Sequence, residues 1–376
     1  MTRWKHIAQH VRGAGAFCDL VPWFGFVDDG VFVTKSGALG LVLALDGIDH
    51  ECLDIAARER ATGRFEAALR LFDEQTRVYQ YLLKRPVTPR PDTGTGTPAV
   101  DALLARRHAF RQQQGASSFE VSLYLVVVAD RPREAASRLH GLTNAARHPW
   151  AAVRQALSSH ATAVVLDADM QRRLAQLRHR CDAFVQQLAE AGAPRPLDAR
   201  AAFAFFRHLL NYEPAKADAV SLTADTRLDF DTADSTLECH RTHLRLDDRY
   251  VRVLTLKEPP PQTHAAMFEA LLDVASPMVI ATEWRREGHD RIRREIHARR
   301  RHYHNARVSL TSYLGEPSQP GDLLVDDSAA AVVRDLGAAL TEVTLQGRYF
   351  GEWSLTVVLH DTDPAALGRS VGAVLK

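Results

Sequence analysis

The chain has 376 residues, of which 46% are hydrophobic, and its 47 lysines and arginines against 46 aspartates and glutamates give a net charge of +1. This length exceeds that of a typical single domain, so we expect two domains or subdomains, and the apolar content is enough for a buried core. The near-zero net charge excludes a protein whose whole surface binds nucleic acid or anionic lipid, so any basic function must be local.

The compartment can be predicted from the cysteines and from the hydropathy. Cys18, Cys52, Cys181 and Cys239 are far apart and have no paired spacing, so we expect small buried thiols in a reducing environment rather than disulfides. The N-terminus has no apolar signal core, and no run of about 18 apolar residues occurs anywhere. We therefore expect a soluble, cytoplasmic chain without a transmembrane segment.

Residues 1–130 predict an N-terminal α+β subdomain. The β-rich runs at 26–34 and 38–45 flank Lys35-Ser36-Gly37, a short glycine-containing connection that is typical of a hairpin. A helix, a strand, a helix and a strand are then expected at residues 50–73, 78–84, 100–114 and 119–128. The order β-β-α-β-α-β favours an antiparallel sheet with helices on one face.

Residues 131–218 predict a helical connector. Helices are expected at residues 132–146, 149–159, 168–191 and 198–212. In the last of these, Phe203, Phe206 and Leu210 form an apolar face that leaves Arg207 and His208 outside it.

Residues 219–376 predict a second α+β subdomain of roughly the same order, with its own sheet. Strands are expected at residues 242–246, 250–256, 277–283 and 348–359, and helices at residues 262–274, 285–301, 326–345 and 364–376. The strand at 250–256 alternates Val251, Val253 and Thr255 with other residues, and we expect it in the centre of the second sheet.

The helix expected at 285–301 is the candidate interaction surface. Its basic residues are Arg285, Arg286, Arg291, Arg293, Arg294, Arg300 and Arg301. The acidic residues Glu287, Asp290 and Glu295 can pair with arginines three or four positions away, which favours a solvated, partly self-neutralised helix. The alternative interpretation is that this helix binds another subunit, an acidic partner, nucleic acid or lipid head groups.

Several long segments resemble the TrbE/CagE/VirB-type ATPases of type IV secretion and conjugative transfer. They are PWFGFVDDGV (22–31), KSGAL (35–39), FFRHLLNY (205–212), VRVLTLKEPP (251–260), TEWRR (282–286), HYHNARVSL (302–310) and RYFGEWSLTVVL (348–359). The resemblance implies the N-terminal and central regions of such an ATPase, at the cytoplasmic face of the inner membrane. It also implies docking to small inner-membrane components and self-association, with ATP and Mg²⁺ as cofactors of the full-length family.

The ATPases of that family hydrolyse ATP on a phosphate-binding loop, G-x-x-x-x-G-K-[ST], whose lysine directly follows a glycine. The six lysines of this chain follow Trp4, Thr34, Leu83, Ala215, Leu256 and Leu375, so the loop is missing. We expect no motor domain, no catalytic residues and no cofactor site in this chain, which would end before the motor. The alternatives are a part of an ATP-binding enzyme whose motor lies in a continuation of the gene or in another chain, or a weak nucleic-acid-binding module that uses the arginine helix.

The segment from Cys239 to His243, Cys-His-x-x-His, offers nitrogen and sulfur ligands of the kind that zinc prefers. We expect no metal, because residues 240 and 243 of a strand point to opposite faces and no second ligand pair has suitable spacing. The pairs Asp28-Asp29 and Asp247-Asp248 are expected in solvated turns rather than as a general acid and base.

Overall fold

The computed structural model describes residues 17–48, 53–87, 96–113, 118–130, 159–258, 267–306 and 327–376. The chain divides into two compact units. The sheet unit comprises Met1–Leu71, Arg77–Glu283 and Ser354–Lys376, and the helical unit comprises Phe72–Thr76 and Trp284–Trp353. The subdomain boundaries expected at residues 130 and 218 stay a prediction.

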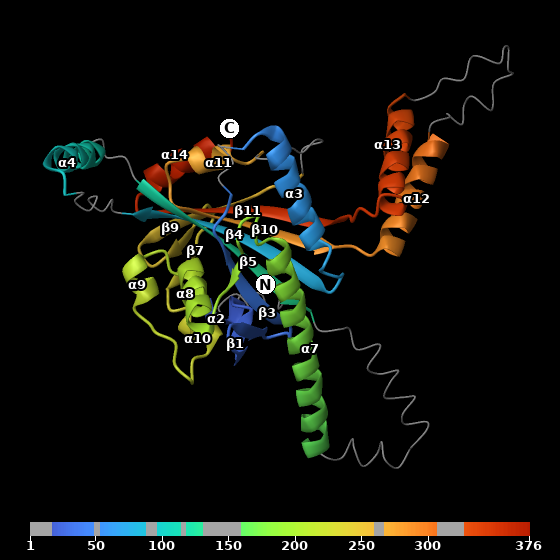
Figure 1. The fold of residues 1–376 in the computed structure, drawn as a ribbon, viewed down its shortest axis with the longest axis horizontal. Coiled ribbons are helices and arrows are strands. Elements are labelled where there is room, and N and C mark those ends of the chain that lie inside the picture. Colours follow the sequence, from blue (N-terminus) through green and yellow to red (C-terminus); the bar gives the residue numbers. More distant parts are fainter. Residues whose placement is uncertain are drawn as a thin grey trace, which may run out of the picture. The chain divides into compact units, whose positions relative to one another are not determined.

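The strands form a single eleven-stranded sheet in the order β1-β2-β3-β5-β4-β10-β11-β9-β8-β7, and β6 pairs with β3 (Figure 1). Their bounds are β1 Trp23–Asp28, β2 Val31–Thr34, β3 Leu39–Leu45, β4 Thr76–Val87, β5 Ser118–Ala129, β6 Arg195–Pro196, β7 Leu237–Cys239, β8 Leu244–Leu246, β9 Arg249–Thr255, β10 Met278–Arg286 and β11 Gly351–Asp361. The α+β class is confirmed, but the expectation of two separate sheets is wrong. The strands of the two sequence halves meet where β4 pairs with β10, and local periodicity carries no information about which strand edges pair.

The described helices are α2 Phe17–Leu20, α3 Ile55–Leu69, α4 Pro98–Gln113, α7 Ser159–Gln187, α8 Ala199–Leu210, α9 Pro214–Asp218, α10 Leu228–Asp231, α11 Ala270–Asp273, α12 His289–Ala306, α13 Asp327–Thr344 and α14 Pro364–Val374. The helices predicted at 132–146 and 149–159 lie outside the described residues, apart from Ser159 at the start of α7. Of the helix predicted at 262–274, the part from residue 267 onward contains only the short α11.

The predicted hairpin is confirmed as β2 and β3, joined through Lys35-Ser36-Gly37. The run at 26–34 is not one strand, because the chain turns at Gly30 and separates β1 from β2. Gly30 has a φ of +72°, and a Cβ at this position would lie 2.2 Å from the backbone oxygen of Leu197. Glycine is therefore required both by the backbone conformation and by the close approach of the segment before α8.

Helix α8 provides the core on one face of the sheet. Its N-cap residue Asp198 accepts a hydrogen bond of 2.7 Å from the backbone N–H of Ala201. Phe203, Phe205 and Phe206 are buried against strand residues, and the ring of Phe206 stacks on Trp23 of β1 with 4.5 Å between centroids. The predicted amphipathic helix is thus present, but Arg207, expected outside the apolar face, is fully buried.

Successive side chains of strand β11 pack alternately into two hydrophobic clusters. Val357 and Leu359 pack with Leu367 and Val371 of α14, whereas Val358 packs on the core that contains α8. Strand β9 lies between β11 and β8, so the prediction of an interior strand at 250–256 is confirmed.

The helical unit consists chiefly of α12 and α13, which pack along each other (Figure 1). Ile296 of α12 and Ala329 and Val343 of α13 are buried. The expectation that Arg285 and Arg286 begin this helix is wrong, because both belong to β10 and α12 starts at His289. The intervening Gly288 fits closely, since a Cβ there would lie 2.7 Å from the Glu74 carboxylate.

Candidate functional site

The seven arginines of the predicted interaction surface do not form one group. Arg285 and Arg286 are engaged at the end of β10. The Arg285 Nε donates to the backbone oxygen of Glu74 at 3.4 Å, and the Arg286 guanidinium lies 3.5 Å from the centroid of the Tyr349 ring. Both side chains therefore make contacts within the helical unit, and the other five arginines lie on α12.

One flank of α12 is neutralised by ion pairs along the helix. Arg291 lies 2.9 Å from Glu287 and Arg299 lies 2.7 Å from Glu295, each four residues apart. Exposed pairs of this kind contribute about 0.3–0.5 kcal/mol each to helix stability. This flank matches the self-neutralised helix that the sequence favoured.

The other flank carries exposed basic side chains, which we call the basic stripe: Arg293, Arg294, His297, Arg301 and His304. Within the part of the chain that the structure describes, no carboxylate lies within ion-pair distance of these five side chains. The Arg294 Nε donates to the backbone oxygen of Asp290 at 3.2 Å. A backbone carbonyl is neutral, so this hydrogen bond does not neutralise the charge of the Arg294 guanidinium. Arg300 is exposed as well, so the predicted surface includes four exposed arginines for which no ion pair is found among the described residues: Arg293, Arg294, Arg300 and Arg301. The role of this surface in binding stays a prediction.

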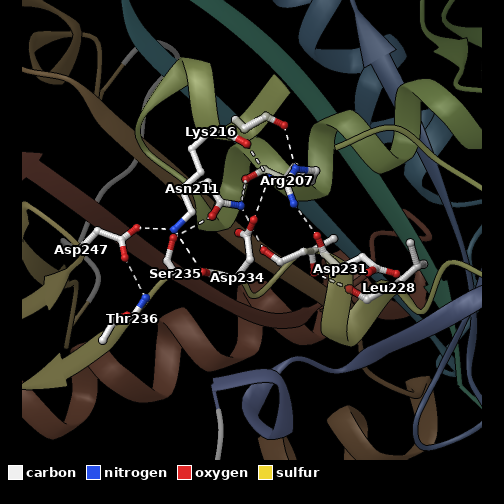
Figure 2. Close-up of polar contacts among 11 residues, drawn as sticks. Arg207, Asn211, Lys216, Leu228, Asp231, Asp234, Ser235, Thr236 and Asp247 are labelled. Carbon is white, nitrogen blue, oxygen red and sulfur yellow. Dashed lines mark hydrogen bonds and ion pairs between the residues drawn. The ribbon is translucent and has the colours of Figure 1, made fainter. Parts of the chain in front are cut away.

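A buried polar network surrounds Arg207 of α8 (Figure 2). The Arg207 Nε donates to the backbone oxygen of Ala217 at 2.7 Å, and its terminal nitrogens donate to the backbone oxygens of Lys216 and Asp231. One terminal nitrogen also lies 3.0 Å from the Asp234 carboxylate. The guanidinium therefore ties the segment after α8 to the helix itself.

Two further residues extend this network. The Asn211 side-chain nitrogen donates to the backbone oxygens of Arg207 and Thr232, each at 3.0 Å, and its oxygen accepts from Ser235 at 2.7 Å. These contacts join α8 to the segment that precedes β7. Because the donors and acceptors satisfy one another, the network is suited to holding the fold rather than to proton transfer.

Asp247 closes the network at the turn between β8 and β9. Its carboxylate accepts from the Lys216 Nζ at 2.6 Å and from the Thr236 backbone N–H at 2.9 Å. Partial burial acts to raise the pKa of Asp247, but the hydrogen bonds from Lys216 and Thr236 outweigh it and lower the pKa below its ordinary value. Asp247 is thus an ionised structural residue rather than a catalytic acid.

A small cavity of about 20 Å³ lies between the end of α8 and strands β4, β10 and β11, lined among others by His208, Tyr212 and His360. The buried His360 ring stacks on Tyr212 with 4.1 Å between centroids. Burial and the nearby Arg249 lower the pKa of His360 to about 3, so the imidazole is neutral. The cavity has room for about one water molecule, which is far too small for a nucleotide.

The His240 and His243 side chains do not point to opposite faces as expected. Residues 240–243 form the turn between β7 and β8, and the two rings stack with 4.6 Å between centroids. His240 lies 3.3 Å from Glu238. Across the described ranges, no cluster of three metal-ligating side chains occurs.

The first aspartate pair also makes structural contacts. Asp28 lies 2.7 Å from Arg178 of α7, and the Asp29 carboxylate accepts from the Ala199 backbone N–H at the start of α8 at 3.1 Å. The two carboxylates thus fix the turn after β1 to two helices. No signal in the sequence identifies these partners, nor the burial of Arg207, because all of them depend on contacts between distant segments.

Comparison with known proteins finds one matching family model and one distant relative. Residues 30–137, which contain β2 to β5, match the family described as type IV secretion system ATPase VirB4/TrbE, N-terminal domain. The chain is also 21% identical over 371 residues to the conjugal transfer protein TrbE of Rhizobium radiobacter, an alignment that covers 96% of this chain and 43% of TrbE. Residues 30–137 therefore correspond to a VirB4/TrbE N-terminal domain.

More particularly, the chain is a distant homologue of TrbE over most of its length. It spans less than half the length of that curated relative. None of the described helices combines the length and the apolar character needed to cross a bilayer.

Proposed function

We propose that this chain is the N-terminal assembly module of a type IV secretion ATPase of a conjugal transfer system, which docks on small inner-membrane components from the cytoplasmic side. The observation that carries the proposal is the match of residues 30–137 to the N-terminal domain of the VirB4/TrbE ATPases, together with the similarity to TrbE along 96% of the chain. Self-association within the assembly belongs to the same proposal.

The proposed role is not catalytic. Phosphoryl transfer depends on a loop of backbone N–H groups around the phosphates, a lysine on the β- and γ-phosphates and bound Mg²⁺. None of the six lysines follows a glycine, so the residues present do not supply that loop. In the alternative proposal, ATP and Mg²⁺ are bound by a motor domain that a continuation of the gene or another chain supplies.

Membrane recruitment tests the proposal directly. The purified chain is mixed with vesicles that contain the small inner-membrane components of the transfer system, or with empty vesicles of the same lipids. The vesicles are then floated on a density gradient. We expect the chain to float with the component-containing vesicles only. Equal recovery with both vesicle types would remove the basis of the proposal.

A second candidate function is weak binding of nucleic acid. The exposed Arg293, Arg294 and Arg301 favour it, since arginines without acidic partners attract phosphate groups. The net charge of +1 limits it, because the rest of the surface adds no attraction for a polyanion.

A further inference from the structure

Three exposed apolar side chains lie on neighbouring elements at the β1 end of the sheet. Leu20 of α2, Phe24 of β1 and Phe230 of α10 are 72%, 46% and 65% exposed. Helix α10 contacts both α2 and β1 (Figure 1). Single exposed apolar side chains are common on protein surfaces, but a group of them on contacting elements is typical of an interaction site. We call Leu20, Phe24 and Phe230 the apolar corner.

Polar contacts hold the elements of the apolar corner together. The Lys35 Nζ donates to the backbone oxygen of Cys18 at 2.7 Å and lies 3.1 Å from the carboxylate of Asp229, so it joins α2 to α10. The Trp23 Nε1 donates to the Thr232 Oγ1 at 3.0 Å, which joins β1 to the end of α10. A surface whose parts are fixed in advance loses little conformational freedom when it binds. The apolar corner is therefore a preformed surface.

The charges beside the apolar corner are of both signs. Lys35 and Arg227 lie 3.1 Å and 2.9 Å from the buried carboxylate of Asp229, so two cations share one acid. The Arg227 side chain is 61% exposed, and its guanidinium lies 5.4 Å from the centroid of the Phe24 ring. Asp19 of α2 is exposed as well. The surface thus carries an excess positive charge at Arg227 and an exposed carboxylate at Asp19.

We infer that the apolar corner is an interface between two copies of this chain that are related by a twofold axis. In such an interface a surface meets an identical surface, so it must be complementary to itself. The apolar corner of one copy would cover that of the other, and Arg227 of each copy would lie near Asp19 of the other. The inference names a surface for the self-association included in the proposed function, and it rests on that function.

The mixed charges favour a second copy over a partner that carries one sign of charge. Nucleic acid or an anionic lipid surface would be attracted by Arg227 but repelled by Asp19. A uniformly acidic or basic peptide would leave one of these two side chains opposite a like charge, which is unfavourable. A repeat of the same surface provides a counter-charge for both side chains and an apolar partner for the apolar corner.

Photo-crosslinking with mixed isotopes tests the inference. Benzoylphenylalanine replaces Leu20 in the full chain, or Ile55 as a control, because Ile55 is 78% exposed on α3 and does not belong to the apolar corner. The photoreactive chain is mixed with an equal amount of unmodified chain labelled with heavy nitrogen, and the mixture is irradiated. Only a contact between two copies can join a light peptide to a heavy one. We expect position 20, and not position 55, to capture heavy peptides from residues 17–24 or 227–231.

Sedimentation equilibrium of variants measures the contribution of each part of the surface. The double variant L20S/F230S should weaken self-association at least about tenfold, whereas the control I55S should leave it unchanged. The variant D19N should weaken it at low salt, and its difference from the wild type should disappear at high salt because exposed ion pairs are screened. Circular dichroism confirms that all three variants are folded.

Three results would overturn the inference: crosslinks from position 20 only within one chain, no crosslink at that position, or equal self-association of L20S/F230S and the wild type. In cells that carry the complete transfer system, capture of another protein, of lipid or of nucleic acid at position 20 would also overturn it. The vesicle recruitment assay separates the two proposals. A chain that is recruited but gives no crosslink between copies contradicts only this inference, whereas a chain that is not recruited contradicts the proposed docking function.

Discussion

The guanidinium of Arg207 has no exposed surface and lies 3.0 Å from the carboxylate of Asp234, 27 positions further along the chain. The same guanidinium donates to the backbone oxygens of Lys216, Ala217 and Asp231. One side chain of α8 thus fixes the conformation of the whole segment that leads from the helix back to the sheet.

Replacement of this arginine should be severely destabilising. In Arg207→Ala, three buried or partly buried carbonyl oxygens lose their donor and the more exposed Asp234 carboxylate loses its partner, so we expect a loss of about 3 kcal/mol in the free energy of unfolding. Arg207→Lys keeps the charge but not the planar arrangement of donors, so it should lose less. Urea unfolding measures both, with the exposed Arg200→Ala on the same helix as a control that changes stability by less than about 0.5 kcal/mol. A loss of similar size for Arg200→Ala and Arg207→Ala would contradict the role of the network.

The two glycines Gly30 and Gly63 should respond in opposite directions to replacement by alanine. Gly30→Ala should destabilise by about 2 kcal/mol or more, because φ is +72° and the new Cβ would meet the Leu197 oxygen at 2.2 Å. Gly63 lies in α3 with nothing within 4 Å of an added Cβ, so Gly63→Ala should stabilise by about 0.5–1 kcal/mol. In thermal unfolding, the midpoint of Gly30→Ala should therefore lie below that of the wild type, and the midpoint of Gly63→Ala should lie above it. A neutral Gly30→Ala would show that the turn before β2 adjusts freely.

Stability should depend on pH through His360. The folded pKa of about 3 lies below the ordinary value of 6.5, so between these limits the unfolded chain binds a proton that the folded chain does not. The free energy of unfolding should fall by up to about 1.4 kcal/mol per pH unit as the pH decreases from 6.5 towards 3, and this contribution is constant above 6.5. Urea unfolding at several pH values tests it, and His360→Phe should show a flatter profile in that window. Identical profiles for the two proteins would mean that His360 is not the group responsible.

The purified chain should not turn over ATP. Without the phosphate-binding loop and its lysine, phosphate release should equal that of a buffer blank, and calorimetry should detect no Mg²⁺-dependent nucleotide binding. Hydrolysis that follows the folded protein through successive purification steps would reveal a nucleotide site that the sequence does not indicate.

Any affinity for nucleic acid should be weak and lost as salt increases. Each phosphate contact on duplex DNA contributes a slope of about 0.9 in the logarithmic plot of affinity against salt. The three arginines of the basic stripe should therefore give a shallow slope, and R293Q/R301Q should make it shallower. Fluorescence anisotropy with a labelled duplex measures it. Tight, sequence-specific binding that survives high salt would contradict both this prediction and the proposed assembly role.

Local pattern was sufficient where a segment determines its own conformation. The alternation of residues 250–256 predicted β9, and the glycine-containing connection at Lys35-Ser36-Gly37 predicted the β2–β3 hairpin. The helix α8 was predicted from its apolar spacing, with Asp198 as its cap in the structure.

Such local patterns do not predict contacts between segments that are distant in the sequence. The spacing of apolar residues in α8 does not indicate that Arg207 is buried, since its burial depends on carbonyl groups of the later segment 216–231. In the same way, Trp284, Arg285 and Arg286 are compatible with a helix by composition, and only the pairing of β10 with its neighbours keeps them extended. The candidate surface was predicted as a set of arginines, but their division into paired and unpaired flanks required the structure.

The pairing of β4 with β10 has a consequence for how the protein is made. β4 leaves the ribosome long before β10, so one edge of a long strand has no partner while most of the chain is still being synthesised. Sheets that depend on such distant pairs fold slowly, and open strand edges promote aggregation in the meantime. The nascent N-terminal half should therefore need protection by chaperones until β10 and β11 emerge, and a fragment that stops before residue 278 should be recovered mainly as aggregate.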